Sequence, residues 1–207
     1  MTFKFATIAA AMALVAAPIS SALAQPAPPS TDPSKVPAGT YAVEPFHTRV
    51  LFAINHMGFT TYYGDFTGVS GTLTIDPDKV GATTLSISIP VDSVSTTNTK
   101  LDGELKSAAW LDAATYPTIT FKATKVTRTG ADTADVTGDF TLHGVTEPVT
   151  LTVKFNAVGP NFMSQKTTVG FDATTQIKRS DFGVKNYVPV IGDDVSVTIS
   201  AAFEKTN

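Results

Sequence analysis

The chain has 207 residues and a formal net charge of −3, with 43% hydrophobic and 16% charged residues. This length indicates one domain, with or without short appendages, and the lack of a Lys/Arg cluster in the sequence argues against nucleic acid as a partner. Thirteen Phe against one Trp and five Tyr indicate an interior that requires apolar bulk more than hydrogen bonds.

Residues 1–24 have the features of a cleavable signal peptide. Lys4 gives a positive start, residues 5–19 form an uncharged, Ala-rich apolar run, and Ala22-Leu23-Ala24 matches the small-x-small cleavage pattern. We therefore expect the mature chain to begin at Gln25. The alternative is an uncleaved membrane anchor, but a run rich in Ala rather than Leu would span a bilayer weakly.

The cysteine count and the next segment indicate where the protein works. An exported chain without cysteine forms no disulfides and carries no lipid-modified N-terminal cysteine, so its core alone must stabilise it. This suits a bacterial periplasmic protein. Five prolines between residues 25 and 37 predict that residues 25–38 form an extended tether without a packing role, followed by the folded domain over residues 39–207.

From Gly39 onward, period-2 alternation predicts about eight or nine strands that are each apolar on one face. The run from His47 to His56 shows the pattern, with Val50, Phe52 and Ile54 on one side. Single-faced alternation favours antiparallel pairing with the outer face in water, and short turns favour an up-and-down order.

Glycine and proline predict two irregularities in this pattern. Phe66 and Leu73 have opposite parity, so a bulge or sharp bend near Gly68 and Gly71 is the simplest way to place both inside. Pro90 lacks the backbone N–H that a central strand uses, so it should lie at a strand end.

The segment between Val94 and Pro117 departs from the strand pattern. Leu101, Leu105 and the alanines after them recur at helical spacing behind a cap at Asn98, which predicts one or two short helices across a sheet edge or a barrel opening. The segment contains the sole Trp, Trp110. The sequence is equally compatible with a Trp110 that plugs the core and with one that forms a wall of a ligand site.

Two architectures bury one face of eight strands, a sandwich and a closed barrel. A long meander with one helical interruption favours the barrel, which also leaves no exposed edge. We therefore predict an all-β, eight-stranded antiparallel barrel. At this strand number the interior is either filled by side chains or holds one small ligand, and composition does not decide between the two.

Four motifs point to a family. They are His47-Thr48-Arg49-Val50-Leu51-Phe52 with His56 beyond it; Leu105-Lys106-Ser107-Ala108 followed by Tyr116-Pro117-Thr118-Ile119-Thr120-Phe121; Leu142-His143-Gly144-Val145-Thr146; and Arg179-Ser180-Asp181-Phe182-Gly183. In this order and spacing, over about Thr40 to Glu204, the chain resembles the YceI-like family of periplasmic proteins. The resemblance implies an extended lipocalin-like barrel that binds polyisoprenoid or related long-chain lipids in its lumen. Glu44 and Thr48 depart from the Asp and Ser that are more common in the family.

The inward faces of the strands give the expected lining of the lumen. These residues are Val50, Phe52, Ile54, Phe66, Leu85, Ile87, Trp110, Phe121, Phe140, Val169, Phe171 and Phe182. We expect Phe182, on a loop, to close the barrel.

Polar residues at the rim are the candidates for contact with a lipid head group: His47, His56 and Arg179. For His47 a hydrogen-bonded position at a strand start is favoured over a head-group contact. For Arg179 we expect an ion pair with Asp181 that orders their loop. The spacing of the histidines does not resemble a metal-ligand set, so neither a metal nor a cofactor other than the lipid is expected.

The expected function is that of a periplasmic carrier that holds a polyprenyl or isoprenoid-quinone type of lipid for transport or storage, with transient contact to a membrane surface. A structural or stress-response barrel with a filled core is the alternative. An uncharacterised hydrolase is less favoured, because nucleophile elbows, phosphate loops and zinc motifs are lacking in the sequence. The sequence leaves the oligomeric state open between monomer and homodimer.

Overall fold

The computed structural model describes residues 28–206, so the signal peptide expected over residues 1–24 lies outside the described part. Strands dominate these residues, with one α-helix, α1 (Thr99–Lys106), and short 3-10 segments at η1 (Pro33–Lys35), η2 (Val80–Ala82), η3 (Val91–Ser93) and η4 (Arg179–Phe182). The strands are β1 (Gly39–Val43), β2 (Arg49–His56), β3 (Thr60–Phe66), β4 (Ser70–Ile75), β5 (Thr84–Pro90), β6 (Thr118–Arg128), β7 (Thr133–Leu142), β8 (Val145–Pro160), β9 (Thr167–Lys178) and β10 (Ile191–Lys205).

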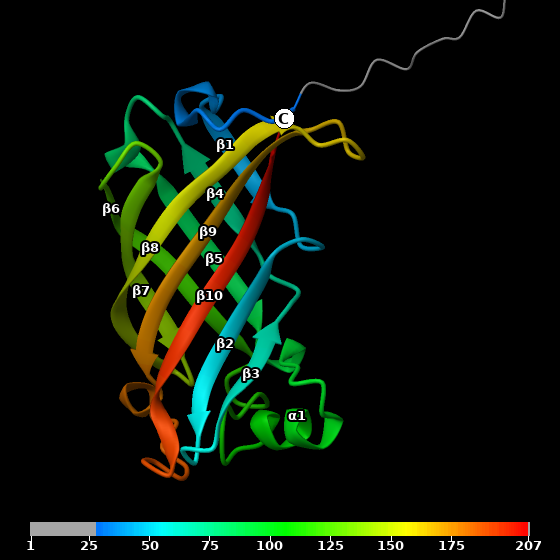
Figure 1. Cartoon of the computed structure of the whole chain (residues 1–207), viewed down its shortest axis with the longest axis vertical. Helices are drawn as coiled ribbons and strands as arrows, with labels where there is room; N and C mark the ends of the chain where they lie inside the picture. Colours follow the sequence, from blue (N-terminus) through cyan, green and yellow to red (C-terminus); the bar gives the residue numbers. More distant parts are fainter. Residues whose placement is uncertain (1–27, 207) are drawn as a thin grey trace, which may run out of the picture.

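These strands form a closed antiparallel barrel with eight strand positions, as the sequence predicts (Figure 1). The order is β1-β4-β5-β6-β7-β8-β9-β10, and pairing of β1 with β10 closes the ring. The β2–β3 hairpin continues the β1 and β4 positions rather than adding new ones. Val43 of β1 pairs with Phe203 and Arg49 of β2 pairs with Ser200, so β1 and β2 lie end to end along β10.

The interruption between β3 and β4 is the bend that the glycines predict. Gly68 and Gly71 both have positive φ, 64° and 147°. A Cβ on Gly71 would lie 2.1 Å from the carbonyl oxygen of Ser86, so the close approach of the neighbouring strand requires glycine there. The change of parity places Phe66 and Leu73 inside together, each under 10% exposed.

The barrel has two distinct ends, which we name after the elements that cover them. At the η1 end, η1 lies near the β6–β7 turn and the β4–β5 turn; at the α1 end, α1 lies beside the β2–β3 turn (Figure 1). Asn98 caps α1, its side chain accepting hydrogen bonds from the N–H groups of Lys100 and Leu101 at 3.2 and 3.3 Å, which confirms the predicted helix start. Among residues 28–206, no helix has the length and apolarity to cross a membrane.

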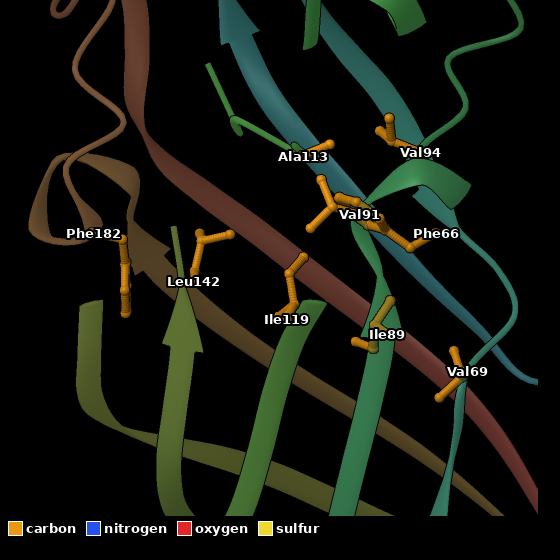
Figure 2. Packing of buried hydrophobic residues seen from close by; sticks show 9 residues of the cluster. All are labelled: Phe66, Val69, Ile89, Val91, Val94, Ala113, Ile119, Leu142 and Phe182. Carbon is orange, nitrogen blue, oxygen red and sulfur yellow. The ribbon is translucent and has the colours of Figure 1, made fainter. Parts of the chain in front are cut away.

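A cluster of buried side chains lies near the α1 end of the barrel. Figure 2 shows this cluster, in which Phe66 of β3, Ile89 of β5 and Ile119 of β6 pack with Val91 of η3 and Phe182 of η4. Packing of strand residues against the two 3-10 segments fixes the loops that carry them. The strand ending at Pro90 passes directly into η3, as expected for a proline that cannot serve in a central strand.

The segment before β1 corrects one expectation from the sequence. Residues 28–38 do pack: the backbone of Ser30 pairs with Val158 through two hydrogen bonds of 2.8 Å, and Val36 is 3% exposed in a core cluster with Phe155 and Phe203. The Tyr41 hydroxyl donates a hydrogen bond to the carbonyl of Pro37 at 2.6 Å. Proline limits helix and sheet formation but not burial, so a proline-rich stretch can still cover the end of a barrel.

Candidate functional site

The barrel encloses a cavity of about 650 Å³. Known small-molecule sites occupy roughly 300–1,000 Å³, so this cavity has room for one ligand. Its lining runs from Val36 and Arg128 at the η1 end to Leu105 and Tyr187 at the α1 end. Between the ends the wall consists almost entirely of aliphatic and aromatic side chains, because each strand turns its apolar face inward.

The structure brings most of the predicted lining residues together around this cavity. Those on its wall are Val50, Phe52, Ile54, Phe66, Leu85, Ile87, Trp110, Phe121, Phe140 and Phe171. Val169 and Phe182 lie away from it. Val169 is fully buried in the cluster around Phe155 and Phe203, and Phe182 packs edge-on against Phe140 with 5.2 Å between ring centroids.

Phe52 owes its position to a glycine on the neighbouring strand. Phe52 pairs with Gly64, where a Cβ would lie 2.3 Å from the Phe52 ring. The ring therefore lies over bare backbone, and it also contacts the Phe66 ring with 5.7 Å between centroids. Because Gly64 leaves this space open, β2 places an aromatic side chain on the cavity wall without pushing β3 outward.

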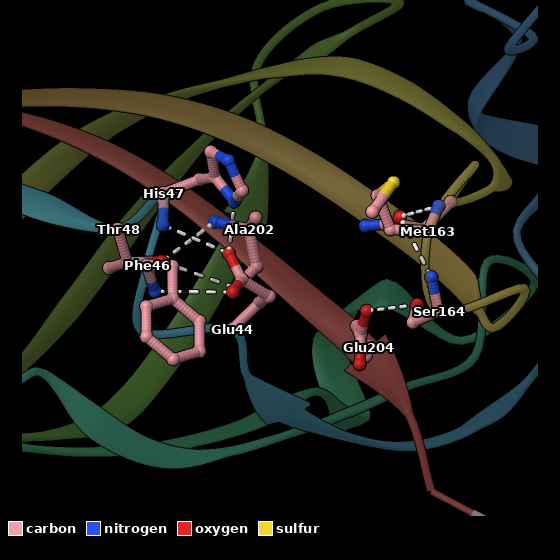
Figure 3. Close-up of polar contacts among 9 residues, drawn as sticks. Glu44, Phe46, His47, Thr48, Met163, Ser164, Ala202 and Glu204 are labelled. Atoms are coloured by element: carbon pink, nitrogen blue, oxygen red, sulfur yellow. Dashed lines mark hydrogen bonds and ion pairs between the residues drawn. The ribbon is translucent and has the colours of Figure 1, made fainter.

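His47 lies outside the cavity. Its side chain is 77% exposed, and its Nδ1 is 2.7 Å from the Glu44 carboxylate, which also accepts the backbone N–H groups of Phe46 and His47 (Figure 3). Thr48 completes the turn by accepting the N–H of Ala202 at 3.0 Å. Glu44 and Thr48, the departures from the family pattern, thus hold the break between β1 and β2. The hydrogen-bonded role of His47 agrees with the favoured interpretation, whereas its place away from the lumen does not suit a head-group contact.

His56 lies on the cavity wall at the α1 end. It ends β2, and its ring lies 5.9 Å from that of Tyr62 on β3, which also lines the cavity. These two rings bring an imidazole and a phenol hydroxyl to the wall at this end, where Glu104 and Arg179 also line the cavity. Within residues 28–206, no group of three or more His, Asp or Glu side chains is placed to hold a metal ion.

Arg179 is 4% exposed and acts through backbone carbonyls rather than through Asp181. Its guanidinium donates at 2.8–3.0 Å to the carbonyl oxygens of four residues in the loop between β9 and β10 and at the start of β10: Val184, Asn186, Ile191 and Gly192. It also lies over the Trp110 ring, 5.4 Å from the centroid. The expected ion pair with Asp181 is therefore wrong, although the expected loop-ordering role is met by other partners.

Asp193, near the start of β10, is the carboxylate that acts on Arg179. Burial lowers the pKa of Arg179, and the charge of Asp193 partly opposes this effect. Asp193 itself accepts hydrogen bonds from the backbone N–H and the hydroxyl of Ser180 at 2.9 and 2.8 Å. Burial alone would raise the pKa of Asp193, but these bonds, with Lys178 and Arg179 nearby, outweigh it, and the pKa lies below its ordinary value.

Sequence reasoning missed several residues of the wall. Tyr62 shares its parity with Phe66, so the alternation of β3 would have identified it. Leu101 and Leu105 have the helical spacing that predicts α1, and the structure places both on the wall. Val36 and Tyr187 lie in loops, where no periodicity indicates which way a side chain points.

A family model and several known proteins match most of this chain in sequence. The YceI-like domain family model matches residues 41–203. Protein YceI of Escherichia coli O6:H1 (strain CFT073) is 39% identical over 154 residues, which cover 74% of this chain and 80% of that protein. A UPF0312 protein of Pseudomonas putida (strain W619) is 39% identical over 139 residues, 67% of this chain and 72% of the relative.

Solved structures share the fold. Burkholderia cenocepacia BcnA superposes with a TM-score of 0.70 at 26% identity, covering 77% of this chain and 98% of its own. A YceI protein of Campylobacter jejuni gives a TM-score of 0.66 at 26% identity over 74% of this chain and 91% of its own. A polyisoprenoid-binding domain from Saccharophagus degradans gives 0.64 at 16% identity, over 82% of this chain and all of its own. With a family match over most of its length and a barrel shared with solved relatives, this chain belongs to the YceI-like family.

Proposed function

We propose that this chain is a periplasmic carrier that holds one long-chain isoprenoid or related lipid inside its barrel. The observation that carries the proposal is the cavity of about 650 Å³ with an apolar wall contributed by strands all around the barrel. Burial of hydrocarbon is favourable by about 0.8 kcal/mol per methylene. Ordering a flexible chain offsets part of this gain, so the net affinity is far below the simple sum.

The ligand class is supported by the chemistry of the wall. Side chains such as Phe52, Ile87 and Phe171 offer contact surface but no hydrogen bonds, which suits a hydrocarbon chain. Polar side chains lie at the ends, where a head group can stay near water. The S. degradans domain is named for polyisoprenoid binding, while its 16% identity supports only the shared fold. Export to the periplasm is supported by the signal-like residues 1–24 and the cysteine-free sequence.

Two other functions fit the molecule less well. A scaffold barrel with a filled interior should resemble the packing around Val169 and Phe182, but much of the lumen is open instead. Catalysis needs polar groups that converge on a reacting atom. The wall is overwhelmingly apolar, so we favour binding and assign no reaction.

The test is to purify the mature protein from the periplasm of a Gram-negative host and identify what it carries. Native mass spectrometry and organic extraction should release one long-chain lipid per protein, or the delipidated protein should take up one added polyprenol. Protein that stays empty in both experiments would contradict the carrier proposal.

A matched pair of variants tests whether the lipid lies in the lumen. Phe52 faces the cavity and Leu51, its neighbour on β2, is 39% exposed on the outer face. Phe52→Ser should lose most of the bound lipid while its circular dichroism spectrum stays native, and Leu51→Ser should keep its lipid. Equal lipid content in the two variants would place the ligand elsewhere, and unfolding of Phe52→Ser alone would favour a purely structural core.

A further inference from the structure

Large apolar side chains gather on the surface at the α1 end of the barrel. Met57, Phe59, Tyr187 and Val190 are 49%, 83%, 64% and 56% exposed, and we call these four side chains the apolar tip. They come from the β2–β3 turn and from the loop before β10, which lie together at the bottom of Figure 1. The Met57 N–H donates to the Val190 carbonyl at 3.1 Å, so the two loops form one surface.

The apolar tip adjoins one end of the cavity. Tyr187 is both exposed and part of the cavity wall, so its side chain joins this surface to the interior. Its ring lies 6.1 Å from that of Trp110, which is buried on the same wall. His56 and Ile191, which pair across β2 and β10 directly next to the tip, also line the cavity. Apolar surface therefore runs from the interior to the tip.

The two loops that carry the apolar tip are uncharged. Residues 57–64 and 186–192 contain no Asp, Glu, Lys or Arg. Charged side chains line the cavity at both ends, Asp78 and Arg128 among them at the η1 end and Glu104 and Arg179 at the α1 end, but none belongs to these two loops. Uncharged loops can enter a membrane interface without the large cost of removing a charge from water.

A second exposed apolar pair lacks these features. Phe162 and Met163, on the β8–β9 turn, are 70% and 85% exposed but do not line the cavity. Their turn is tied to charged groups, since Lys166 pairs with Glu204 at 3.2 Å. This turn is a matched control for the apolar tip, because its side chains have similar exposure and size but none of its residues lines the cavity.

We propose that the apolar tip is a membrane-docking surface whose partner is the face of a phospholipid bilayer. Met57 and Phe59 enter the interfacial region, where apolar side chains are well accommodated, and bring the end of the cavity beside Tyr187 against the lipid. A bound chain then passes between cavity and bilayer without crossing bulk water. The inference rests on the proposed carrier function, to which it adds the site of exchange.

The test compares vesicle binding of the mature protein and two double variants. Met57→Asn with Phe59→Gln removes the tip while Asn tolerates the positive φ of 58° at position 57, and Phe162→Gln with Met163→Gln alters the control turn. In co-sedimentation with phosphatidylethanolamine/phosphatidylglycerol vesicles, the tip variant should partition about tenfold less than wild type or lower, given the burial of two large apolar side chains. The control variant should partition like wild type. Thermal melts should show that both variants remain folded.

Three results would overturn the docking inference. The first is wild-type protein that does not sediment with vesicles, and the second is an equal loss of vesicle binding in both variants. The third is a wild-type dimer in light scattering that the tip substitutions dissociate, since a second copy would then cover the tip. Lipid content separates this inference from the carrier proposal, because neither Met57 nor Phe59 lines the cavity. Wild-type protein that carries lipid but ignores vesicles refutes docking alone. Protein that binds vesicles through its tip but carries no lipid refutes the carrier alone.

Discussion

Arg179 is the residue on which the loop between β9 and β10 depends. Its guanidinium donates to four carbonyl oxygens while nearly fully buried. We expect Arg179→Met to lower the free energy of unfolding by about 3 kcal/mol or more, because buried carbonyl groups would lose their partners. The free energy of unfolding of Arg179→Lys should lie between those of wild type and Arg179→Met, since an ammonium keeps the charge but cannot reproduce the planar fork of a guanidinium.

Urea unfolding of these two variants and of Lys185→Met measures the effect. Lys185 is an exposed residue of the same loop, so its loss should change stability by less than about 0.5 kcal/mol. A loss for Arg179→Met as small as that for Lys185→Met would show that the loop does not need its buried cation.

Asp193 should make the stability of the folded chain depend on pH. Its pKa in the folded chain lies below the ordinary value of 3.8, so folding favours the ionised form. The stabilisation is fully present above pH 3.8 and is lost as the pH falls through the folded pKa. Asp193→Asn should therefore be less stable than wild type at pH 7, by roughly 0.5–1.5 kcal/mol, and the difference should shrink as acid is added.

The measurement is urea unfolding at a series of pH values from neutral to strongly acidic. Ser180→Ala serves as the partner variant, because it removes the hydroxyl that donates to Asp193 at 2.8 Å. It should reproduce part of the loss at pH 7. A constant difference between wild type and Asp193→Asn at all pH values would contradict the link to ionisation.

Alternation along the sequence predicts which face a residue occupies but not what lies in front of it. Phe52 and Val169 both point inward, yet Phe52 borders open space whereas Val169 meets packed side chains. The difference is set by neighbours distant in sequence, such as Gly64 opposite Phe52 and Phe203 beside Val169. For Arg179, the sequence indicates a nearby carboxylate but cannot show that loop carbonyls point at its guanidinium.

At the scale of elements, regular segments were predictable and their junctions less so. The α1 start at Asn98 and the bend near Gly71 follow from local chemistry, since a capping amide and a positive φ each favour particular residues. The burial of Val36, directly after η1, does not, because it depends on contacts with the distant β8 and β10. The break between β1 and β2 is likewise held by Ala202, far along the chain.

The segment before β1 should contribute measurably to stability. Val36 is buried against β8 and β10, and Val36→Ala removes two methyl groups from that contact. We expect a loss of about 1–3 kcal/mol in the free energy of unfolding. Lys35→Ala, on the exposed side of the same segment, should cost little. Equal and negligible losses would restore the view of this segment as a tether.

At the scale of the whole molecule, the pairing of β1 with β10 turns one meander into an enclosed volume. Eight strand positions were predictable because single-faced alternation and short turns leave few other closed arrangements. The ten observed segments arise from two breaks that leave the circuit of pairing intact. The open lumen was not predictable, because it depends on the space left by all inward side chains together.

An elongated cavity predicts that ligand chain length controls stability. Each added isoprene unit should bury more hydrocarbon against the wall until the lumen is full, after which stabilisation should level off. A ligand at 100 times its Kd adds about 2.7 kcal/mol to folding, which corresponds to a rise of roughly 5–10 °C in Tm for a domain of this size. Melting curves of delipidated protein with prenols of increasing length measure this dependence.

The shape of the series distinguishes a lumen ligand from a surface amphiphile. If the prenol binds in the lumen, Phe52→Ser should reduce the rise in Tm most for the longer prenols, because longer chains contact more of the cavity wall. Leu51→Ser, altered on the outer face, should follow the wild-type series. If short and long prenols raised Tm alike, or if both variants responded as wild type, hydrocarbon would be adsorbing outside the barrel rather than filling the cavity that its eight strand positions enclose.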